Sequence, residues 1–309
     1  MNDSIKMCEG ISDLSDSYSG FLIDQWGTLH NGQCPYDGVI DALKMLKDRQ
    51  KQIIIVSNSG QREQQNRERL SDMGFDENIF DHVVTSAEVT WKMLTKQDDG
   101  ELSNIGSKCL LLSRGGNRSI LNNTDIETVE NVEDADFILL AGSDAPEKLF
   151  ENYYDPILKT ASRKRLKLIC ANPEMKVTID GVNYLGSGDI AKRYTEFGGV
   201  VTYIGKPFPY IYHHAMNLFD NVLPSQMIMI GDSLAHDVRG AQSIGLDSAL
   251  IANGVHAGSF KKIQTTSDIR KILKMMGQNY GITPTYFVPK FNWGKALPDR
   301  KNKRKATKK

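Results

Sequence analysis

Four polar side chains, each placed at or just behind the end of a short apolar run, could act together on a charged ligand. In chain order these residues are Asp24, Ser57, Lys206 and Asp232. A carboxylate at the end of a buried strand costs free energy unless a cation or hydrogen bonds compensate it. Open α/β sheets also bind their ligands at this edge. A turn-capping role could explain any one of these residues alone, but the repetition indicates a ligand site.

The serine and the lysine suit a ligand that carries a phosphate group. The Ser57 hydroxyl could donate a hydrogen bond to a phosphate oxygen, and the backbone N–H of Asn58 could join it. Ser57 could instead cap the helix expected over 61–73, although Ser59 is better placed to do so. Lys206 could neutralise a phosphoryl group or a nearby carboxylate, and its alternative is an ordinary surface lysine.

The carboxylates suit a hard cation. Asp232 and Asp237 follow one apolar run and lie five residues apart, and both could join Asp24 around a single ion. Mg²⁺ prefers an octahedral set of oxygen ligands and keeps several waters. One carboxylate pair alone is weak evidence for a metal site. The full series of polar residues at successive strand ends is strong evidence.

The elements that must position these residues alternate regularly along the chain. Strands are expected at 21–23, 52–56, 109–113, 136–141, 166–171, 200–204, 226–230 and 247–251. Helices are expected at 38–49, 61–73, 86–96, 146–161, 188–197, 208–219 and 235–244. This alternation predicts an α/β fold in which helices cover both faces of a parallel sheet.

Composition narrows the class of protein. The 309 residues carry 38 basic and 38 acidic side chains, so the formal net charge of zero does not favour nucleic acid or an anionic membrane as a partner. The cysteines are scattered and form no CxxC pair, which argues against a zinc site or a disulfide framework. Reduced cysteines, a polar segment 1–20 and no run long enough to span a bilayer favour a cytoplasmic location.

The order Asp, Ser, Lys and Gly-Asp-x-x-x-x-Asp resembles the haloacid dehalogenase-like hydrolase superfamily over roughly residues 18–255. Its members use an aspartate nucleophile, and most are Mg²⁺-dependent phosphatases. Further details resemble class IIA, the NagD-type and 4-nitrophenylphosphatase-like enzymes. They are the large insert between Ser57 and Lys206, the sequence Cys-Ala-Asn-Pro-Glu at 170–174, the Gly-Ser-Gly turn at 186–188, and the Asp-Gln-Trp-Gly form of the first motif.

The resemblance implies a Rossmann-like parallel sheet core with an inserted α/β cap of the C2 type. The core would comprise 1–84 and 201–284, and the cap would comprise 85–200. The basic segment 285–309 would form a tail that is disordered at its end. The resemblance also implies a homodimer formed through the cap.

The resemblance also assigns roles to single residues. Asp24 would be the nucleophile that forms an aspartyl-phosphate, and Ser57, Asn58 and Lys206 would hold the phosphoryl oxygens. The Mg²⁺ ligands would be Asp24, Asp232, Asp237 and the backbone carbonyl of Trp26. From the cap, Asn172 and Glu174 would face a small phosphorylated substrate, although both could simply build a turn around Pro173.

Trp26 is the departure from the family pattern, because the phosphatases usually carry a second aspartate there. An indole N–H donates hydrogen bonds but cannot exchange a proton near neutral pH. General acid–base help is worth about 10²–10⁴-fold in rate. His30 or His236 could replace the missing aspartate as the group that transfers the proton, or each could be an ordinary packed or capping histidine.

Three functions therefore remain open. The first is a Mg²⁺-dependent phosphatase that is slow or restricted to good leaving groups. The second is a weakly active or inactive member that binds a phosphorylated ligand or a protein. The third is hydrolysis of another bond to carbon, such as a carbon–halogen bond, which needs no Mg²⁺ and is the least favoured.

Overall fold

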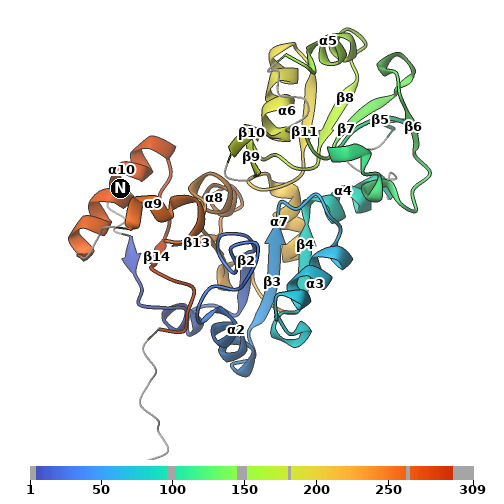
Figure 1. The fold of residues 1–309 in the computed structure, drawn as a ribbon. Helices are drawn as coiled ribbons and strands as arrows, with labels where there is room; N and C mark the ends of the chain where they lie inside the picture. The colour runs from blue at the N-terminus through green and yellow to red at the C-terminus, as the bar shows by residue number, and fades with distance from the viewer. Residues whose placement is uncertain are drawn as a thin grey trace, which may run out of the picture.

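The computed structural model describes residues 5–95, 102, 104–144, 152–179, 182–261 and 265–294. It contains two parallel sheets that belong to two units, one of which lies above the other in the view of Figure 1. The first sheet has seven strands in the order β1-β14-β13-β12-β2-β3-β4. These strands are Lys6–Met7, Tyr286–Val288, Asp247–Ile251, Met227–Gly231, Gly20–Asp24, Gln52–Ser57 and His82–Thr85.

Both faces of this core sheet are covered because successive side chains point to opposite faces and both sets are apolar. Phe21 and Ile23 pack on one face, whereas Leu22 packs on the other. The first face is covered by helices α1 (Ser12–Ser15), α2 (Val39–Asp48) and α3 (Glu63–Asp72). The second is covered by α4 (Ser86–Thr95), α7 (Pro209–Met216) and α8 (Arg239–Ser243).

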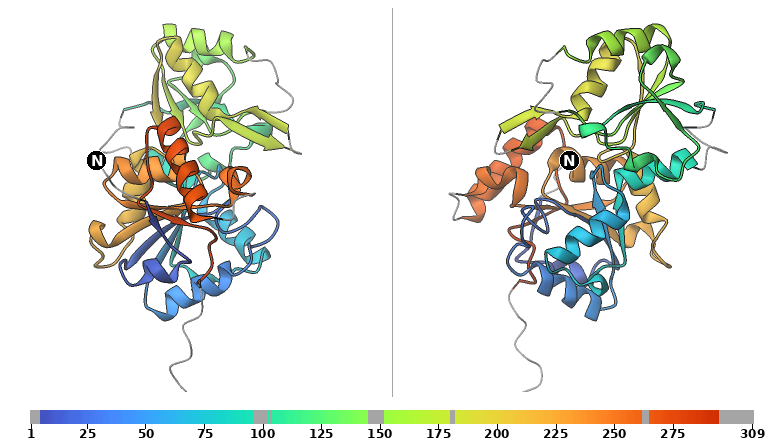
Figure 2. Two further views of the ribbon diagram at one scale, coloured as in Figure 1. Left: turned by 90° about the vertical axis from the view of Figure 1, so that its left-hand side faces the viewer. Right: turned by 45° about the vertical axis from the view of Figure 1, so that its right-hand side comes forward.

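The second sheet forms the inserted cap. Its strand order is β11-β8-β7-β5-β6, with bounds Val200–Tyr203, Lys167–Cys170, Phe137–Leu140, Lys108–Leu112 and Glu127–Val129. Helices α5 (Asp155–Arg163) and α6 (Ser187–Glu196) pack in its hydrophobic cluster. An antiparallel hairpin of β9 (Lys176–Ile179) and β10 (Val182–Leu185) lies at the junction of cap and core (Figure 2).

The remaining elements are short, except for one helix at the side of the core. The 3₁₀ helices are Glu77–Ile79, Arg114–Gly116, Ser119–Leu121, Val132–Asp134, Pro224–Gln226 and Gly254–His256. A π-helix, Leu234–Val238, leads into α8. Helices α9 (Ala257–Phe260) and α10 (Thr266–Tyr280) follow β13, and α10 packs its apolar side, including Leu273 and Met276, beside Phe287.

All eight predicted strands are present, but three of the expected domain limits are wrong. Strand β11 pairs with β8 of the cap, so the residues just after 200 do not begin the core. Strand β14 pairs with β13 and β1, so the chain beyond 285 continues the core sheet. The α4 helix, assigned to the cap, contacts β4 and α7 of the core.

The two errors that concern strands have one physical cause. A short apolar run predicts a buried strand, but it carries no record of the neighbour with which the strand will pair. Two further expectations fall outside the described residues. They are the disordered end of the tail, within 295–309, and the first part of the helix expected at 146–161.

Candidate active site

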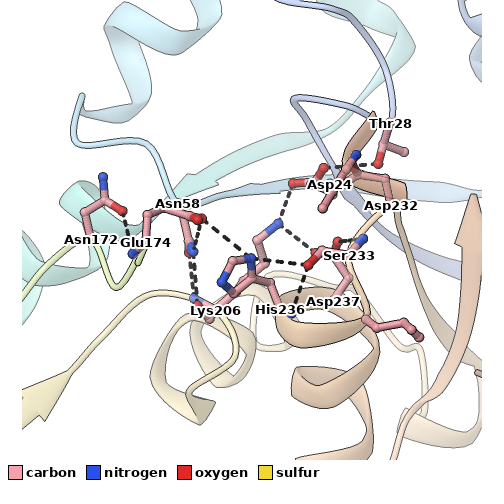
Figure 3. A network of polar contacts seen from close by, with 12 residues as sticks. Asp24, Thr28, Asn58, Asn172, Glu174, Lys206, Asp232, Ser233, His236 and Asp237 are labelled. Atoms are coloured by element: carbon pink, nitrogen blue, oxygen red, sulfur yellow. Dashed lines mark hydrogen bonds and ion pairs between the residues drawn. The ribbon is translucent and has the colours of Figure 1, made fainter. Parts of the chain in front are cut away.

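Asp24 is the last residue of β2, and its side chain is held at the carboxyl end of the core sheet (Figure 3). The Thr28 hydroxyl donates a hydrogen bond of 3.0 Å to Oδ2 of Asp24. The Lys206 ammonium group donates to the other oxygen, Oδ1. Asp24 is only 7% exposed, so its charge is compensated by these contacts rather than by bulk water.

Lys206 is a buried catalytic candidate and not a surface lysine. It lies just beyond β11, is 3% exposed, and also donates to Oδ1 of Asp237 at 2.8 Å. Burial alone lowers the pKa of Lys206, but Asp237 and Asp24 outweigh burial and raise that pKa well above its usual value. The side chain is therefore a fixed positive charge beside Asp24.

Three carboxyl groups gather around this lysine. One oxygen from each of Asp24, Asp232 and Asp237 lies within 4.8 Å of the others, and all three residues are buried. Burial and the other two carboxylates raise the pKa of Asp232 to about 9, and burial and Asp24 raise that of Asp237 to about 6. The single ammonium group of Lys206 does not balance three carboxyl groups. A divalent cation that prefers oxygen ligands would supply the missing positive charge.

Two glycines make room for Asp232 in this cluster. A Cβ atom on Gly27 would lie 2.4 Å from Oδ2 of Asp232, and one on Gly254 would lie 1.8 Å from the same oxygen. Both glycines have positive φ angles, 90° and 60°, which residues with side chains rarely adopt. The same oxygen accepts a hydrogen bond of 2.6 Å from the backbone N–H of Val255.

Ser57 is the last residue of β3 and Asn58 follows it. In the sheet register Asp24 of β2 lies opposite Val56, the residue before Ser57. Ser57 is 8% exposed, and its hydroxyl has no hydrogen-bond partner among the residues that the structure describes. The Asn58 side chain instead contacts Lys206: its Oδ1 accepts from the Lys206 backbone N–H at 2.6 Å, and its Nδ2 donates to the Lys206 carbonyl at 3.0 Å. Contact of either residue with a substrate stays a prediction.

The two cap residues lie in one turn but make different contacts (Figure 3). Glu174 reaches the core, where its Oε1 accepts from Asn58 at 2.9 Å and lies 3.7 Å from Nδ1 of His236. Asn172 accepts a hydrogen bond of 3.3 Å from the backbone N–H of Glu174, as a turn-building residue does. Glu174 is therefore the one of the pair that the structure brings to the core site.

The residues considered for proton transfer differ in their surroundings. The Trp26 side chain is large and apolar, and the residue is 54% exposed. His30 is buried against Phe75, and its Nδ1 accepts from the backbone N–H of Gly32 at 2.9 Å. Burial and Arg69 lower the pKa of His30 to about 4, so it carries no imidazolium proton at neutral pH. His236 lies at the cap contact beside Glu174.

The structure adds contacts that sequence reasoning missed. Thr28 orients Asp24, and its place directly after Gly27 in the same loop could have indicated it. The Val255 backbone N–H on Asp232 has no counterpart in the sequence pattern, because any residue but proline offers that donor.

Two family models match this chain. One, described as haloacid dehalogenase-like hydrolase, matches residues 21–127, and another, described as HAD-hydrolase-like, matches residues 203–272. The matches include the loop after β2 and the segment from Lys206 to Asp237. The chain belongs to the haloacid dehalogenase-like hydrolase family.

This hydrolase also resembles proteins of known name along most of its length. It is 27% identical to 5'-nucleotidase YutF of Bacillus subtilis over 82% of this chain and 93% of that one. It is 25% identical to an acid sugar phosphatase of Staphylococcus haemolyticus over 77% of this chain and 87% of that one. Such relatives support its placement in class IIA.

Solved structures agree with the fold. A haloacid dehalogenase-like hydrolase from Brucella suis 1330 superposes with a TM-score of 0.74 and 27% identity, over 92% of this chain and 99% of that one. The 4-nitrophenylphosphatase of Thermotoga maritima gives a TM-score of 0.67 at 24% identity, over 91% and 97%. Within the described part of this hydrolase, no helix has both the length and the apolar character needed to cross a membrane.

Proposed function

We propose that this hydrolase is a Mg²⁺-dependent phosphatase that acts on small phosphomonoesters through an aspartyl-phosphate on Asp24. The observation that carries the proposal is the contact of the buried Lys206 ammonium group with both Asp24 and Asp237. This contact supports the proposal because phosphoryl transfer to a carboxylate needs a positive charge beside the carboxylate that attacks. The named phosphatases among the relatives support the same class of reaction.

The geometry suits a two-step displacement. In the first step an oxygen of Asp24 attacks phosphorus while the bond from phosphorus to the leaving oxygen breaks. Thr28 holds Asp24 in place, and Lys206 neutralises the charge on the phosphoryl oxygens. In the second step water attacks phosphorus, and inorganic phosphate leaves as the Asp24 carboxylate is restored.

The residues present fit a bound Mg²⁺ ion. Asp24, Asp232 and Asp237 would hold it, together with the carbonyl of Trp26 as the resemblance implies. When bound, the ion would neutralise charge on the phosphoryl oxygens and on the carboxylates around them.

Trp26 limits which substrates can react well. The indole cannot protonate the leaving oxygen, His30 is neutral, and His236 lies between Ser233 and Glu174 at the cap contact, so we expect the leaving group to depart with little help. We therefore expect esters of acidic alcohols, such as phenols, to react faster than alkyl phosphates. Ser57, whose hydroxyl has no hydrogen-bond partner in the described part of the chain, would contact the phosphoryl oxygens, and Glu174 would lie on the cap side of the substrate.

The test is release of 4-nitrophenol from 4-nitrophenyl phosphate, with Mg²⁺ or with excess EDTA, by the wild type and by Asp24→Asn. This leaving group needs little protonation, so the missing acid matters least. We expect Mg²⁺-dependent turnover in the wild type and a loss of at least about 10³-fold in the variant, because the nucleophile is removed. Equal rates in the wild type and Asp24→Asn would contradict the proposal.

The absence of a catalytic acid at Trp26 favours a second candidate, a protein that binds phosphorylated ligands without turnover. It predicts no phosphate release, together with Mg²⁺-dependent binding of inorganic phosphate measured by calorimetry.

Homodimerisation through the cap stays a prediction from the family resemblance. Sedimentation equilibrium of the full chain tests it.

A further inference from the structure

A continuous series of polar contacts connects the cap to the catalytic lysine (Figure 3). Glu174 of the cap accepts a hydrogen bond of 2.9 Å from Nδ2 of Asn58. The same amide group binds both backbone groups of Lys206, at 2.6 Å and 3.0 Å. The Lys206 ammonium group then contacts Asp24. One side chain, Asn58, therefore contacts both the cap and the residue that holds the nucleophile.

The cap turn is packed closely where it meets this asparagine. A Cβ atom on Gly205 would lie 2.5 Å from Cδ of Pro173 and 2.6 Å from Oδ1 of Asn58. Such distances are too short for a side chain, so Pro173 and Asn58 both pack against the bare backbone of Gly205. The turn at 172–174 thus lies in close contact with the core at Gly205, and there Glu174 reaches Asn58.

Asn58 suits this task because an amide offers a donor and an acceptor at once. Its oxygen is 2.6 Å from the Lys206 nitrogen, and its nitrogen serves two acceptors, the Lys206 carbonyl and Glu174. Asn58 is 9% exposed, so water does not readily replace these partners. A carboxylate at this position would keep the acceptor but would face Glu174 with like charge.

We propose that Asn58 is a positioning residue that couples the contact of the cap with the core to the position of Lys206. With Glu174 bonded to Asn58, the backbone at Lys206 is fixed, and its ammonium group is held against Asp24. When the cap lifts, Asn58 loses one of its three partners and Lys206 is held less firmly. The proposal rests on the proposed function only for its catalytic consequence, not for the coupling itself.

The test is a double-substitution cycle read by hydrogen–deuterium exchange of the full-length protein. Asn58→Asp removes the donor and places a carboxylate against Glu174, and we expect exchange in residues 171–175 to rise about tenfold or more. Glu174→Gln keeps an acceptor for Asn58, so exchange should change less than about threefold. In the double variant Gln at 174 can donate to Asp at 58, and protection of the turn should return.

The matched control is Asn78→Asp. Asn78 donates to Asp76 at 2.8 Å on the surface before β4, so the same change opposes two carboxylates at the other end of the strands. It should leave exchange at 171–175 unchanged. If Asn58→Asp leaves the turn protected, or if the double variant exchanges as fast as Asn58→Asp, the coupling does not exist.

Steady-state kinetics with 4-nitrophenyl phosphate provide a second readout. Coupling predicts that Asn58→Asp lowers kcat about tenfold or more and that adding Glu174→Gln recovers part of the loss, since the bond to the Lys206 carbonyl stays broken. If Asn58 only supported the Lys206 backbone, Glu174→Gln would not rescue it. Absence of turnover in the wild type would contradict the proposed function, whereas the exchange cycle would still decide the coupling.

Discussion

At the scale of single residues, Trp26 constrains the chemistry more than any residue that the site retains. It stands two positions after the nucleophile and is 54% exposed. Its neighbours do not replace an acid, because Gln25 cannot titrate and the pKa of His30 is lowered to about 4. Asp24, the proposed nucleophile, contacts Lys206 and lies in a cluster with Asp232 and Asp237. The site therefore has the parts for phosphoryl transfer but not the usual proton donor.

Replacing this one residue should restore the acid. We expect Trp26→Asp to raise kcat on an alkyl ester such as glycerol 3-phosphate by about 10²-fold, within the usual range for general acid catalysis. Turnover of 4-nitrophenyl phosphate should change by less than about threefold, because its leaving group needs little protonation. Trp26→Asn, which has nearly the same shape as Asp but cannot titrate, is the control. Equal gains in both variants would show that removal of the indole, and not the new acid, is responsible.

At the scale of elements, α3 and α4 are joined by a bidentate ion pair close to the cap. The Arg62 guanidinium donates to Glu88 at 2.9 Å and 3.3 Å, and it also lies 3.6 Å from the centre of the Trp91 ring. Trp91 in turn donates to the carbonyl of Asn122 in the cap at 2.8 Å. Core and cap are thus connected on this side as well.

This ion pair predicts a pH dependence of stability. Burial raises the pKa of Glu88, but hydrogen bonds from Arg62 and from the Glu63 backbone outweigh burial and leave the pKa below its ordinary value of 4.5. Because the folded-state pKa is lowered, the unfolded state binds more protons, so this stabilisation is present above pH 4.5 and is lost as the pH falls through the folded-state pKa.

The measurement is urea unfolding of the wild type and of Glu88→Gln at a series of pH values from 7 to below 4.5. At pH 7 we expect the variant to be less stable by about 1–3 kcal/mol, and the difference should shrink as the pH falls below 4.5. The control is Glu196→Gln, which breaks an exposed pair with Lys192 and should cost less than about 0.5 kcal/mol. A difference that stays constant with pH would exclude the titration of Glu88 as its cause.

At the scale of the whole molecule, the two ends of the described chain meet in the core sheet. Strand β14 lies between β13 and β1, so it joins the first strand of the chain to the strand that precedes α9. Phe287 and Val288 of β14 are buried, and Phe291 follows them into the core. This edge of the sheet is therefore part of the structure that supports the site.

A substitution in β14 measures how far the core depends on it. We expect Phe287→Ala, at a residue that is 1% exposed, to lower the free energy of unfolding by about 3–5 kcal/mol. Met275→Ala on the exposed side of α10, at a residue that is 54% exposed, should change it by less than about 0.5 kcal/mol. Urea unfolding followed by circular dichroism compares the two. A cost below about 1 kcal/mol for Phe287→Ala would mean that the segment beyond 285 adds little to the core.

The sequence by itself determined that Asp24, Lys206, Asp232 and Asp237 gather at one edge of the sheet. Asp24 and Asp232 each follow or end an apolar run, and parallel strands bring their carboxyl ends to one edge of the sheet. That rule is local, because it needs only the order of strands and helices along the chain. The inserted second unit between Ser57 and Lys206 was implied by the family resemblance and not by this rule.

Only the tertiary structure decided which strands pair and which distant residues touch. β11 pairs within the cap, and β14 pairs within the core. The bonds of Asn58 to Lys206 and Glu174 span 148 and 116 positions of sequence. An apolar pattern reports that a residue is buried but not against what, since pairing depends on the packing of segments that lie far apart along the chain.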